Sequence, residues 1–348
     1  MAIKVLIIDD SAMIRKVFEQ ELSKDPEIEV VGTAPDPFVG RDKIVYLKPD
    51  VITLDIEMPR MDGLTFLGKL MQHYPLPVVV VSSLAKKGGE VAVKAIELGA
   101  VEVLSKPGTA YSVGDMSEQL IEKVKAAAKV KVFKTIDPNK IASKEQNSAL
   151  VTSASLSVKT TNKIIAIGAS TGGTDALREV ISRLPSNSPP VVVVQHMPQN
   201  FTKSFAERLN QICQVQVKEA TDGEYLATGK VLIAPGNQHM EIRRSGISYY
   251  VKLFDGPMMF HQRPAVEILF NSVAKYAGQN SVGVILTGMG KDGAQGLLNM
   301  RQAGASTIAQ DEKSCIVFGM PKEAIDIGAA QVIKPLNMIA QTMLDFCN

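Results

Sequence analysis

The sequence contains no tryptophan, and aromatic residues make up only 5% of its 348 residues. Proteins that hold single-stranded nucleic acid stack the bases on aromatic side chains, so this chain is poorly equipped for that role. Neither sign of charge is in excess, because 38 basic residues and 36 acidic residues leave a net charge of +2. We therefore expect no nucleic-acid partner and no charge-driven binding to a membrane surface.

Cysteine is scarce as well. Cys213, Cys315 and Cys347 lie far apart in the sequence and match neither a disulfide framework nor the spacing of a zinc site. The apolar run within residues 1–10 is too short for a signal peptide. No run approaches the roughly 20 apolar residues of a membrane span. We expect a monomeric protein of the reducing cytoplasm, with no segment inserted in a membrane.

What the sequence does contain is a regular alternation of strand and helix patterns. A length of 348 residues favours two domains. In residues 1–130 five short apolar runs alternate with helical patterns. These runs predict buried strands at Ile3–Ile8, Ile28–Gly32, Val51–Leu54, Val78–Val81 and Val101–Leu104. The repeat predicts a doubly wound α/β domain with a parallel sheet, whose ligands bind beyond the carboxyl ends of the strands.

Polar side chains follow four of these strands directly. They are Asp9, Asp10, Asp55, Ser82 and Lys106. Three carboxylates at one edge of a sheet would repel one another unless a cation lay among them, and Mg²⁺ prefers such oxygen ligands. A lysine and a hydroxyl complete the groups needed to place a phosphoryl group on one carboxylate. Any one of these aspartates could be a helix cap, but five matching positions on four strands favour the phosphoryl site.

Residues 1–130 resemble the receiver domain of two-component signalling, which has a flavodoxin-like fold. The resemblance rests on Asp9-Asp10, the stretch Leu54–Gly63, Ser82 and Lys106-Pro107, in this order and spacing. It implies a response regulator phosphorylated by a histidine kinase.

The receiver resemblance also implies a role for each polar residue. Asp55 would accept the phosphoryl group and Asp10 would be a direct Mg²⁺ ligand, with Asp9 completing the acidic pair. Glu57 would offer its backbone carbonyl to the metal, together with Asp55. The remaining implied features are Ser82 as switch hydroxyl, Lys106 as phosphate contact and a cis Lys106–Pro107 bond.

Residues 131–162 have a different character. The segment is rich in serine, threonine, lysine and asparagine, and its only aromatic residue is Phe133. Such a composition cannot bury a core. We therefore predict three parts: a domain over 1–130, an interdomain linker over 131–162 and a second domain over 163–348.

The second domain begins with the stretch Lys163–Gly173, in which a short apolar run leads into a G-x-S-x-G pattern around Ser170. This pattern places a serine on a sharp strand-to-helix turn with small neighbours, so that its hydroxyl stands clear. A helix is predicted over Thr174–Leu184. Small residues are common at such turns, so the motif alone does not establish a nucleophile.

Further along the second domain, a hairpin is predicted around Ser245-Gly246.

A base for Ser170 can be sought among only four histidines. His73 ends a predicted helix in the first domain, and His239 and His261 lie in polar loop sequence. His196 alone follows a buried strand directly. Asp292 follows another, so a hydroxyl, an imidazole and a carboxylate would meet at one edge of a parallel sheet, as an activated serine requires. The alternatives, a structural histidine and an N-cap aspartate, remain open at this point.

Asp292 also lies within a second motif, which suggests a different role for it. Gly288–Gly293 is a literal G-x-G-x-x-G between a strand and a helix, with Asp311 further along, as in dinucleotide-binding sites. The motif comes late in its domain, and Asp292 within it would repel a pyrophosphate. It leaves the alternative of a non-enzymatic response regulator whose output domain binds a nucleotide or a partner.

Residues 163–348 resemble the catalytic domain of the CheB family, the chemotaxis protein-glutamate methylesterases. The motifs that carry the resemblance are Ile167–Gly173, Val194–Pro198, Ala234–Gly236 and Leu286–Gly293. They imply a second doubly wound, mainly parallel α/β domain without a cofactor.

The CheB resemblance also implies the chemistry. Ser170 would be the nucleophile, His196 the general base and acid, and Asp292 the residue that orients His196. Backbone N–H groups near Thr171 and Met289 would be oxyanion donors. The implied activity is hydrolysis of glutamate γ-methyl esters on chemoreceptors, with release of methanol and deamidation of receptor glutamines, under control of a chemotaxis histidine kinase.

Overall fold

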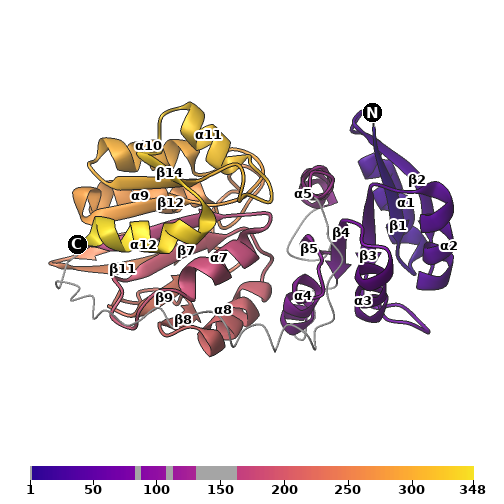
Figure 1. The fold of residues 1–348 in the computed structure, drawn as a ribbon, viewed down its shortest axis with the longest axis horizontal. Coiled ribbons are helices and arrows are strands. Elements are labelled where there is room, and N and C mark those ends of the chain that lie inside the picture. Colours follow the sequence, from indigo (N-terminus) through magenta and orange to yellow (C-terminus); the bar gives the residue numbers. More distant parts are fainter. Residues whose placement is uncertain (1, 83–87, 107–112, 131–162) are drawn as a thin grey trace. The chain divides into compact units, whose positions relative to one another are not determined.

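The computed structural model describes residues 2–82, 88–106, 113–130 and 163–348. The chain divides into two compact units, one formed chiefly by the residues before 131 and the other by those from 163 on. Each is described by itself (Figure 1). The predicted linker and the predicted cis Lys106–Pro107 bond lie outside the described residues.

The N-terminal unit is a five-stranded sheet with the order β2-β1-β3-β4-β5, in which all neighbouring strands are parallel. This confirms the predicted doubly wound fold. The strand order reverses between β1 and β3, which are therefore the strands at which a ligand is expected. In chain order the elements are β1 (Ile3–Ile8), α1 (Ala12–Leu22), β2 (Ile28–Ala34), α2 (Pro37–Leu47), β3 (Val51–Asp55), α3 (Gly63–His73), β4 (Val78–Ser82), α4 (Gly88–Glu97), β5 (Glu102–Ser105) and α5 (Val113–Ala127).

Local sequence explains where these elements begin. The central strands are continuous apolar runs because helices cover both faces of a parallel sheet. Three helices start at a polar side chain that accepts a backbone N–H: Ser11 from Ile14, Asp36 from Phe38 and Val39, and Asp62 from Thr65. Each cap satisfies a helix N–H group that would otherwise lack a partner.

The C-terminal unit contains a seven-stranded parallel sheet with the order β14-β13-β12-β6-β7-β9-β8. Strand β6 lies between β7 and β12, so the order reverses there. In chain order the elements are β6 (Ile164–Ala169), α7 (Gly173–Ile181), β7 (Val191–Gln195), α8 (Phe201–Ile212), β8 (Gln216–Glu219), β9 (Lys230–Ile233), β10 (His239–Ser245), β11 (Ser248–Phe254), α9 (Val266–Tyr276), η2 (Gly278–Asn280), β12 (Ser281–Ile285), α10 (Ala294–Gln302), β13 (Ser306–Gln310), α11 (Met320–Asp326), β14 (Val332–Lys334) and α12 (Leu336–Cys347).

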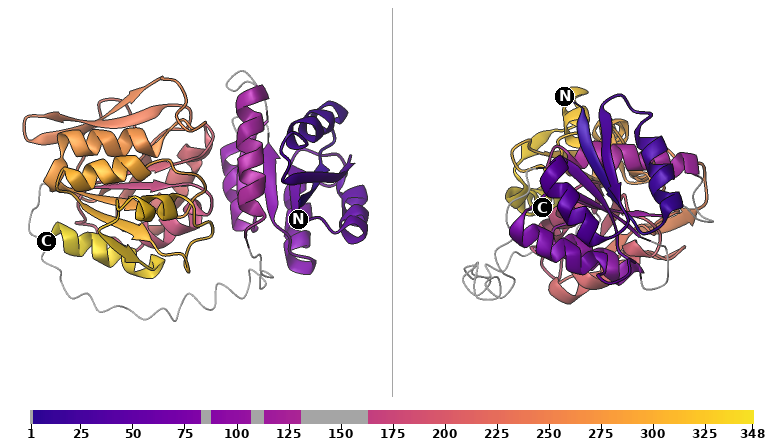
Figure 2. Two further views of the ribbon diagram at one scale, coloured as in Figure 1. Left: turned by 90° about the horizontal axis from the view of Figure 1, so that it is seen from above. Right: turned by 90° about the vertical axis from the view of Figure 1, so that its right-hand side faces the viewer.

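Helices lie on both faces of this sheet, as Figures 1 and 2 show, and a hydrophobic core lies on each face. Along β6, Ile165 and Ile167 point into the core formed with α7, α8 and α12. Ile164 and Ala166 point into the core formed with α9, α10 and the β10–β11 hairpin. The alternation follows from the two-residue period of a strand.

Three details of the second unit differ from the prediction. The hairpin exists, but Ser245 pairs with Ser248, so its turn is Gly246-Ile247. Helix α7 ends at Ile181 and not at Leu184. Helix α11 was not predicted at all. Within the described residues, no helix is both long and apolar enough to cross a membrane.

Candidate active site and phosphorylation site

Ser170 is the first residue beyond β6, and backbone contacts fix its turn. Its N–H donates to Thr287 O at 3.0 Å. Its carbonyl accepts from Gly173 N at 2.7 Å and from Gln195 Nε2 at 2.9 Å. Gly172 has a φ of 75°, a conformation that side chains other than glycine rarely adopt, and this allows the sharp entry into α7.

His196 stands beside Ser170 because the two strands are in register. Ala169 pairs with Gln195 across β6 and β7, and His196 N donates to Ala169 O at 3.1 Å. Ser170 and His196 therefore follow paired residues on adjacent strands. On its other side, His196 Nε2 lies 2.7 Å from Asp292 Oδ2. This contact leaves Nδ1 as the ring nitrogen that can serve a serine.

Asp292 is held by a helix that begins far from it in sequence. Its Oδ2 accepts from Val266 N at 2.7 Å and its Oδ1 from Glu267 N at 2.8 Å, the first two N–H groups of α9. The alternative that Asp292 caps its own helix is wrong, because the N-cap of α10 is Gly293. The carboxylate instead caps α9, and the positive end of that helix stabilises its charge.

The three side chains are more enclosed than the sequence pattern suggested. Ser170 is 2% exposed, His196 5% and Asp292 2%. The expected hydroxyl standing clear of its neighbours is therefore not observed. The reason lies in the adjoining loops: a Cβ at Gly288 would lie 2.8 Å from Ser170 Cβ, and a Cβ at Gly172 would lie 2.6 Å from Ile316 Cβ.

The prediction that His239 lies in a polar loop was wrong. This residue begins β10 and is fully buried. Its Nε2 lies 2.9 Å from Pro257 O, and its Nδ1 accepts from Ala265 N. Burial lowers its pKa, and nearby Arg263 lowers it further. His239 thus supports the segment leading into α9, whereas His261 lies at an exposed turn as expected.

The predicted oxyanion donors lie on both sides of Ser170. The carbonyl of Thr171 accepts from Thr287 Oγ1 at 3.0 Å. Met289 follows Gly288, which approaches Ser170 closely, and its N–H donates to no acceptor among the residues that the structure describes. The N–H of Ser170 itself is already bonded to Thr287. This environment of the Met289 N–H is compatible with its predicted role as an oxyanion donor.

Two supporting residues were missed by sequence reasoning. Gln195 Nε2 donates to the carbonyls of Ser170 and His196, at 2.9 and 3.3 Å. Glu267 is buried beside Asp292, and its Oε1 accepts from Asn271. Burial raises the pKa of Glu267, and the Asp292 charge raises it further. Gln195 could have been noticed as a polar residue directly after an apolar run. No feature of the sequence pointed to Glu267.

The nucleotide-binding alternative does not fit the geometry at Gly288–Gly293. A pyrophosphate at this turn would have to approach the N-terminus of α10, directly beside the buried Asp292 carboxylate. Like charges at such a distance in a buried site repel strongly. The turn instead brings its carboxylate to His196.

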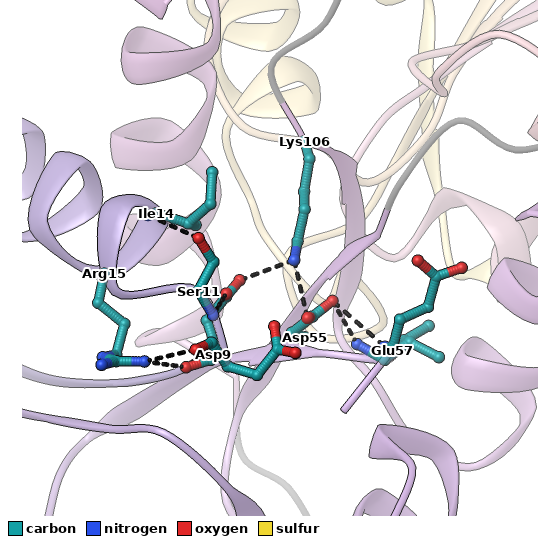
Figure 3. Close-up of polar contacts among 9 residues, drawn as sticks. Asp9, Ser11, Ile14, Arg15, Asp55, Glu57 and Lys106 are labelled. Atoms are coloured by element: carbon teal, nitrogen blue, oxygen red, sulfur yellow. Dashed lines mark hydrogen bonds and ion pairs between the residues drawn. The ribbon is translucent and has the colours of Figure 1, made fainter. Parts of the chain in front are cut away.

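In the N-terminal unit the predicted polar residues gather at the carboxyl ends of the strands. Figure 3 shows Lys106 reaching between two carboxylates, with its Nζ 2.9 Å from Asp9 Oδ2 and 2.7 Å from Asp55 Oδ2. Carboxylate oxygens of Asp9, Asp10 and Asp55 all lie within 4.8 Å of one another. Hard oxygen donors at this spacing suit Mg²⁺.

Burial and the contacts within this cluster shift the pKa values of Asp55 and Lys106. Burial raises the pKa of Asp55, and the Lys106 ammonium only partly offsets this effect. Burial alone would lower the pKa of Lys106, but its contacts with Asp55 and Asp9 raise it overall. Arg15 Nη1 donates to the carbonyls of Asp9 and Asp10, and so fixes the backbone of the acidic pair.

The last two predicted receiver residues are Ser82 and Glu57. Ser82 is the buried last residue of β4. The side chain of Glu57 points away from Asp55 in Figure 3, which leaves its backbone near the acidic cluster. Its N–H lies 3.4 Å from Asp55 Oδ1. A backbone role for Glu57 is compatible with this orientation.

Comparison with known proteins places both units. The CheB methylesterase family model matches residues 165–343, and the response regulator receiver domain model matches residues 5–116. The protein-glutamate methylesterase/protein-glutamine glutaminase 2 of Syntrophus aciditrophicus is 61% identical over 346 residues, 98% of each chain.

The chain belongs to the CheB methylesterase family. A second CheB relative, the protein-glutamate methylesterase/protein-glutamine glutaminase of Salmonella typhimurium, is 52% identical over 98% of this chain and 96% of that protein. Among solved structures, the CheB methylesterase catalytic domain of Thermotoga maritima is 41% identical, with a TM-score of 0.52 over 53% of this chain and 97% of that domain.

Proposed function

We propose that this protein hydrolyses γ-methyl esters of glutamate side chains on chemoreceptors and deamidates receptor glutamines, under control of a histidine kinase that phosphorylates Asp55. The contact that supports the proposal best is the 2.7 Å bond between His196 Nε2 and Asp292 Oδ2, next to Ser170. The names of the two relatives describe the same pair of activities.

The proposed reaction has two halves. Ser170 Oγ attacks the ester carbonyl while His196 takes the serine proton at Nδ1, and Asp292 stabilises the imidazolium that forms. The N–H of Met289 would hold the oxyanion. His196 then returns the proton to the leaving oxygen, and methanol departs. Water, activated by His196, cleaves the acyl-serine and releases the glutamate carboxylate and Ser170.

Deamidation follows the same course with an amide in place of the ester. The leaving group is then ammonia, and the acyl-serine and final glutamate are identical. In both cases the receptor gains a negative charge at the modified side chain.

In the receiver domain, Asp55 would accept the phosphoryl group. Asp10, Asp55 and the Glu57 carbonyl would hold Mg²⁺, with Asp9 beside them, and the metal would neutralise charge on the phosphoryl oxygens. Lys106 already lies between Asp9 and Asp55 and would contact the phosphoryl group. Ser82 would hydrogen-bond to it from the neighbouring strand.

Methanol release from a methylated chemoreceptor fragment tests the catalytic assignment. We expect Ser170→Ala, His196→Ala and Asp292→Asn each to lower kcat by about 10³-fold or more, with losses that do not add in combination because the residues act as a unit. Ser182→Ala is the matched control, because this serine is the C-cap of α7 in the same domain and its hydroxyl makes a weak 3.4 Å contact with Glu179 O. A folded Ser170→Ala protein with native activity would refute the assignment.

A further inference from the structure

Residues 259–262 form a strained turn. Met259 N donates to Gln262 O at 3.1 Å, and Gln262 N donates to Met259 O at 2.9 Å. The two central residues, Phe260 and His261, have φ values of 52° and 57°. Two positive φ angles are the mark of a type I′ turn, which strongly favours Asn-Gly because other side chains are strained there. The chain therefore retains an unfavourable phenylalanine–histidine pair at this turn.

The turn is fixed beside Asp292 from two directions. Arg263, directly after the turn, donates to Gly256 O and to Asn237 Oδ1, each at 2.6 Å, and so braces its base. Three residues further on, α9 begins with the N–H groups that hold Asp292. From the other direction, Lys291 Nζ lies 5.8 Å from the centroid of the Phe260 ring. The ring is thus held next to the residue that precedes Asp292.

Apolar side chains are exposed on both sides of the catalytic group. The Phe260 side chain is 38% exposed on the Asp292 side. Ile316 is also 38% exposed and lies against Gly172, two residues after Ser170. Lys291 is exposed as well. Backbone strain of this kind persists where the surrounding structure enforces it and is found at ligand-binding sites.

We propose that Phe260 determines substrate specificity: the strained turn holds its ring outward, where it contacts the receptor segment that carries the glutamate ester, while Ile316 contacts that segment beside Ser170. The proposal rests on the function proposed above. The expected occupant is an amphipathic protein segment with apolar residues near the modified glutamate and further glutamates around it. The positive charge of Lys291 complements those carboxylates. A glutamate ester without flanking residues offers no such segment for Phe260 to contact.

The double variant Phe260→Asn/His261→Gly tests this, because it removes the ring and installs the residues that the turn favours. Full-length protein is assayed with Mg²⁺ and a small phosphodonor on two substrates, N-acetylglutamate γ-methyl ester and a methylated chemoreceptor cytoplasmic fragment. We expect the melting temperature to rise by roughly 2–4 °C. Hydrolysis of the small ester should be unchanged, and KM for the receptor fragment should rise about tenfold. Ile316→Ser should also raise KM for the receptor fragment.

Ile247→Ser is the matched control, because Ile247 is 81% exposed in the turn of the β10–β11 hairpin of the same domain. It should change neither substrate's kinetics. A double variant with native KM for the receptor fragment would overturn the inference. So would an equal loss on both substrates, because the turn would then support Asp292 and not the receptor. A wild-type protein that hydrolyses neither substrate would instead refute the proposed function itself.

Discussion

At the scale of single residues, the candidate active site depends on groups that hold its reactive atoms. Asp292 was predicted from its position after a strand, but its hydrogen-bond donors, Val266 N and Glu267 N, lie more than 20 residues earlier in the chain. Because every residue except proline carries a backbone N–H, the sequence does not reveal which of these groups will bond to Asp292. Glu267 was missed for a related reason, because it occupies an ordinary position on an amphipathic helix and becomes buried only when α9 packs on α10.

The buried Glu267 should make stability depend on pH. Burial raises its pKa above the 4.5 of an exposed glutamate, so the folded protein binds the proton more tightly than the unfolded chain. The free energy of unfolding then falls as pH rises through this range. Glutamine carries no charge, so we expect Glu267→Gln to raise the melting temperature relative to wild type at about pH 8 and to match it at about pH 4.

Thermal melts at the two pH values check this prediction. Glu207→Gln is the control, since Glu207 is exposed on α8 of the same domain and should show no such pH-dependent gain. An equal gain for Glu267→Gln at both pH values would show that packing, and not charge, explains its effect.

At the scale of elements, the sequence predicted where strands and helices lie better than where they end. The apolar run of β6 located the turn at Ser170, although the strand continues through Gly168 to Ala169. The predicted helix extended to the apolar Leu184, which is buried, yet α7 ends three residues earlier. Helix α11 has only 7 residues, too few for a helical period to be recognised.

The turn after β12 should tolerate no side chain at Gly288. An added Cβ would lie 2.8 Å from Ser170 Cβ and 2.3 Å from Met320 Sδ, and both neighbours are buried. Overpacking of this kind costs about 1–3 kcal/mol of stability. Because it displaces the serine, we expect Gly288→Ala to lower kcat by roughly 10²-fold.

Esterase kinetics and thermal melts check this prediction. The opposite control is Gly68→Ala on α3, where the nearest atom, Leu98 Cδ2, is at an ordinary 3.7 Å. That change should stabilise its helix by about 0.5–1 kcal/mol and leave the esterase unaffected. A Gly288→Ala protein with native kcat would contradict this prediction, because the turn would then have accommodated the methyl group without moving Ser170.

At the scale of the whole molecule, the receiver should control the esterase. We expect the unphosphorylated receiver to restrict access of the receptor to Ser170, and phosphorylation of Asp55 to relieve this restriction. A fragment of residues 147–348 should then be more active on receptors than the unphosphorylated full chain. A small phosphodonor with Mg²⁺ should activate the full chain and leave the fragment unchanged. The fragment is a fair comparison because the related Thermotoga maritima catalytic domain was solved as a separate chain.

Two controls separate regulation from other effects of the phosphodonor. Asp55→Ala in the full chain should abolish the response, and a chelator of divalent cations should do the same, because the carboxylate cluster would lose its cation. A fragment slower than the unphosphorylated full chain would show that the receiver assists the esterase, contrary to this prediction.

The two hydrogen bonds from α9 to Asp292 also make the catalytic group depend on the docking of one helix. Ser170 and His196 follow strands that pair early in the chain, whereas the carboxylate that orients the imidazole is in place only once α9 has docked against the turn after β12. Local unfolding of α9 would therefore remove both donors that hold the carboxylate beside His196. We expect damage that loosens this one helix to abolish the esterase activity before the parallel sheet itself unfolds.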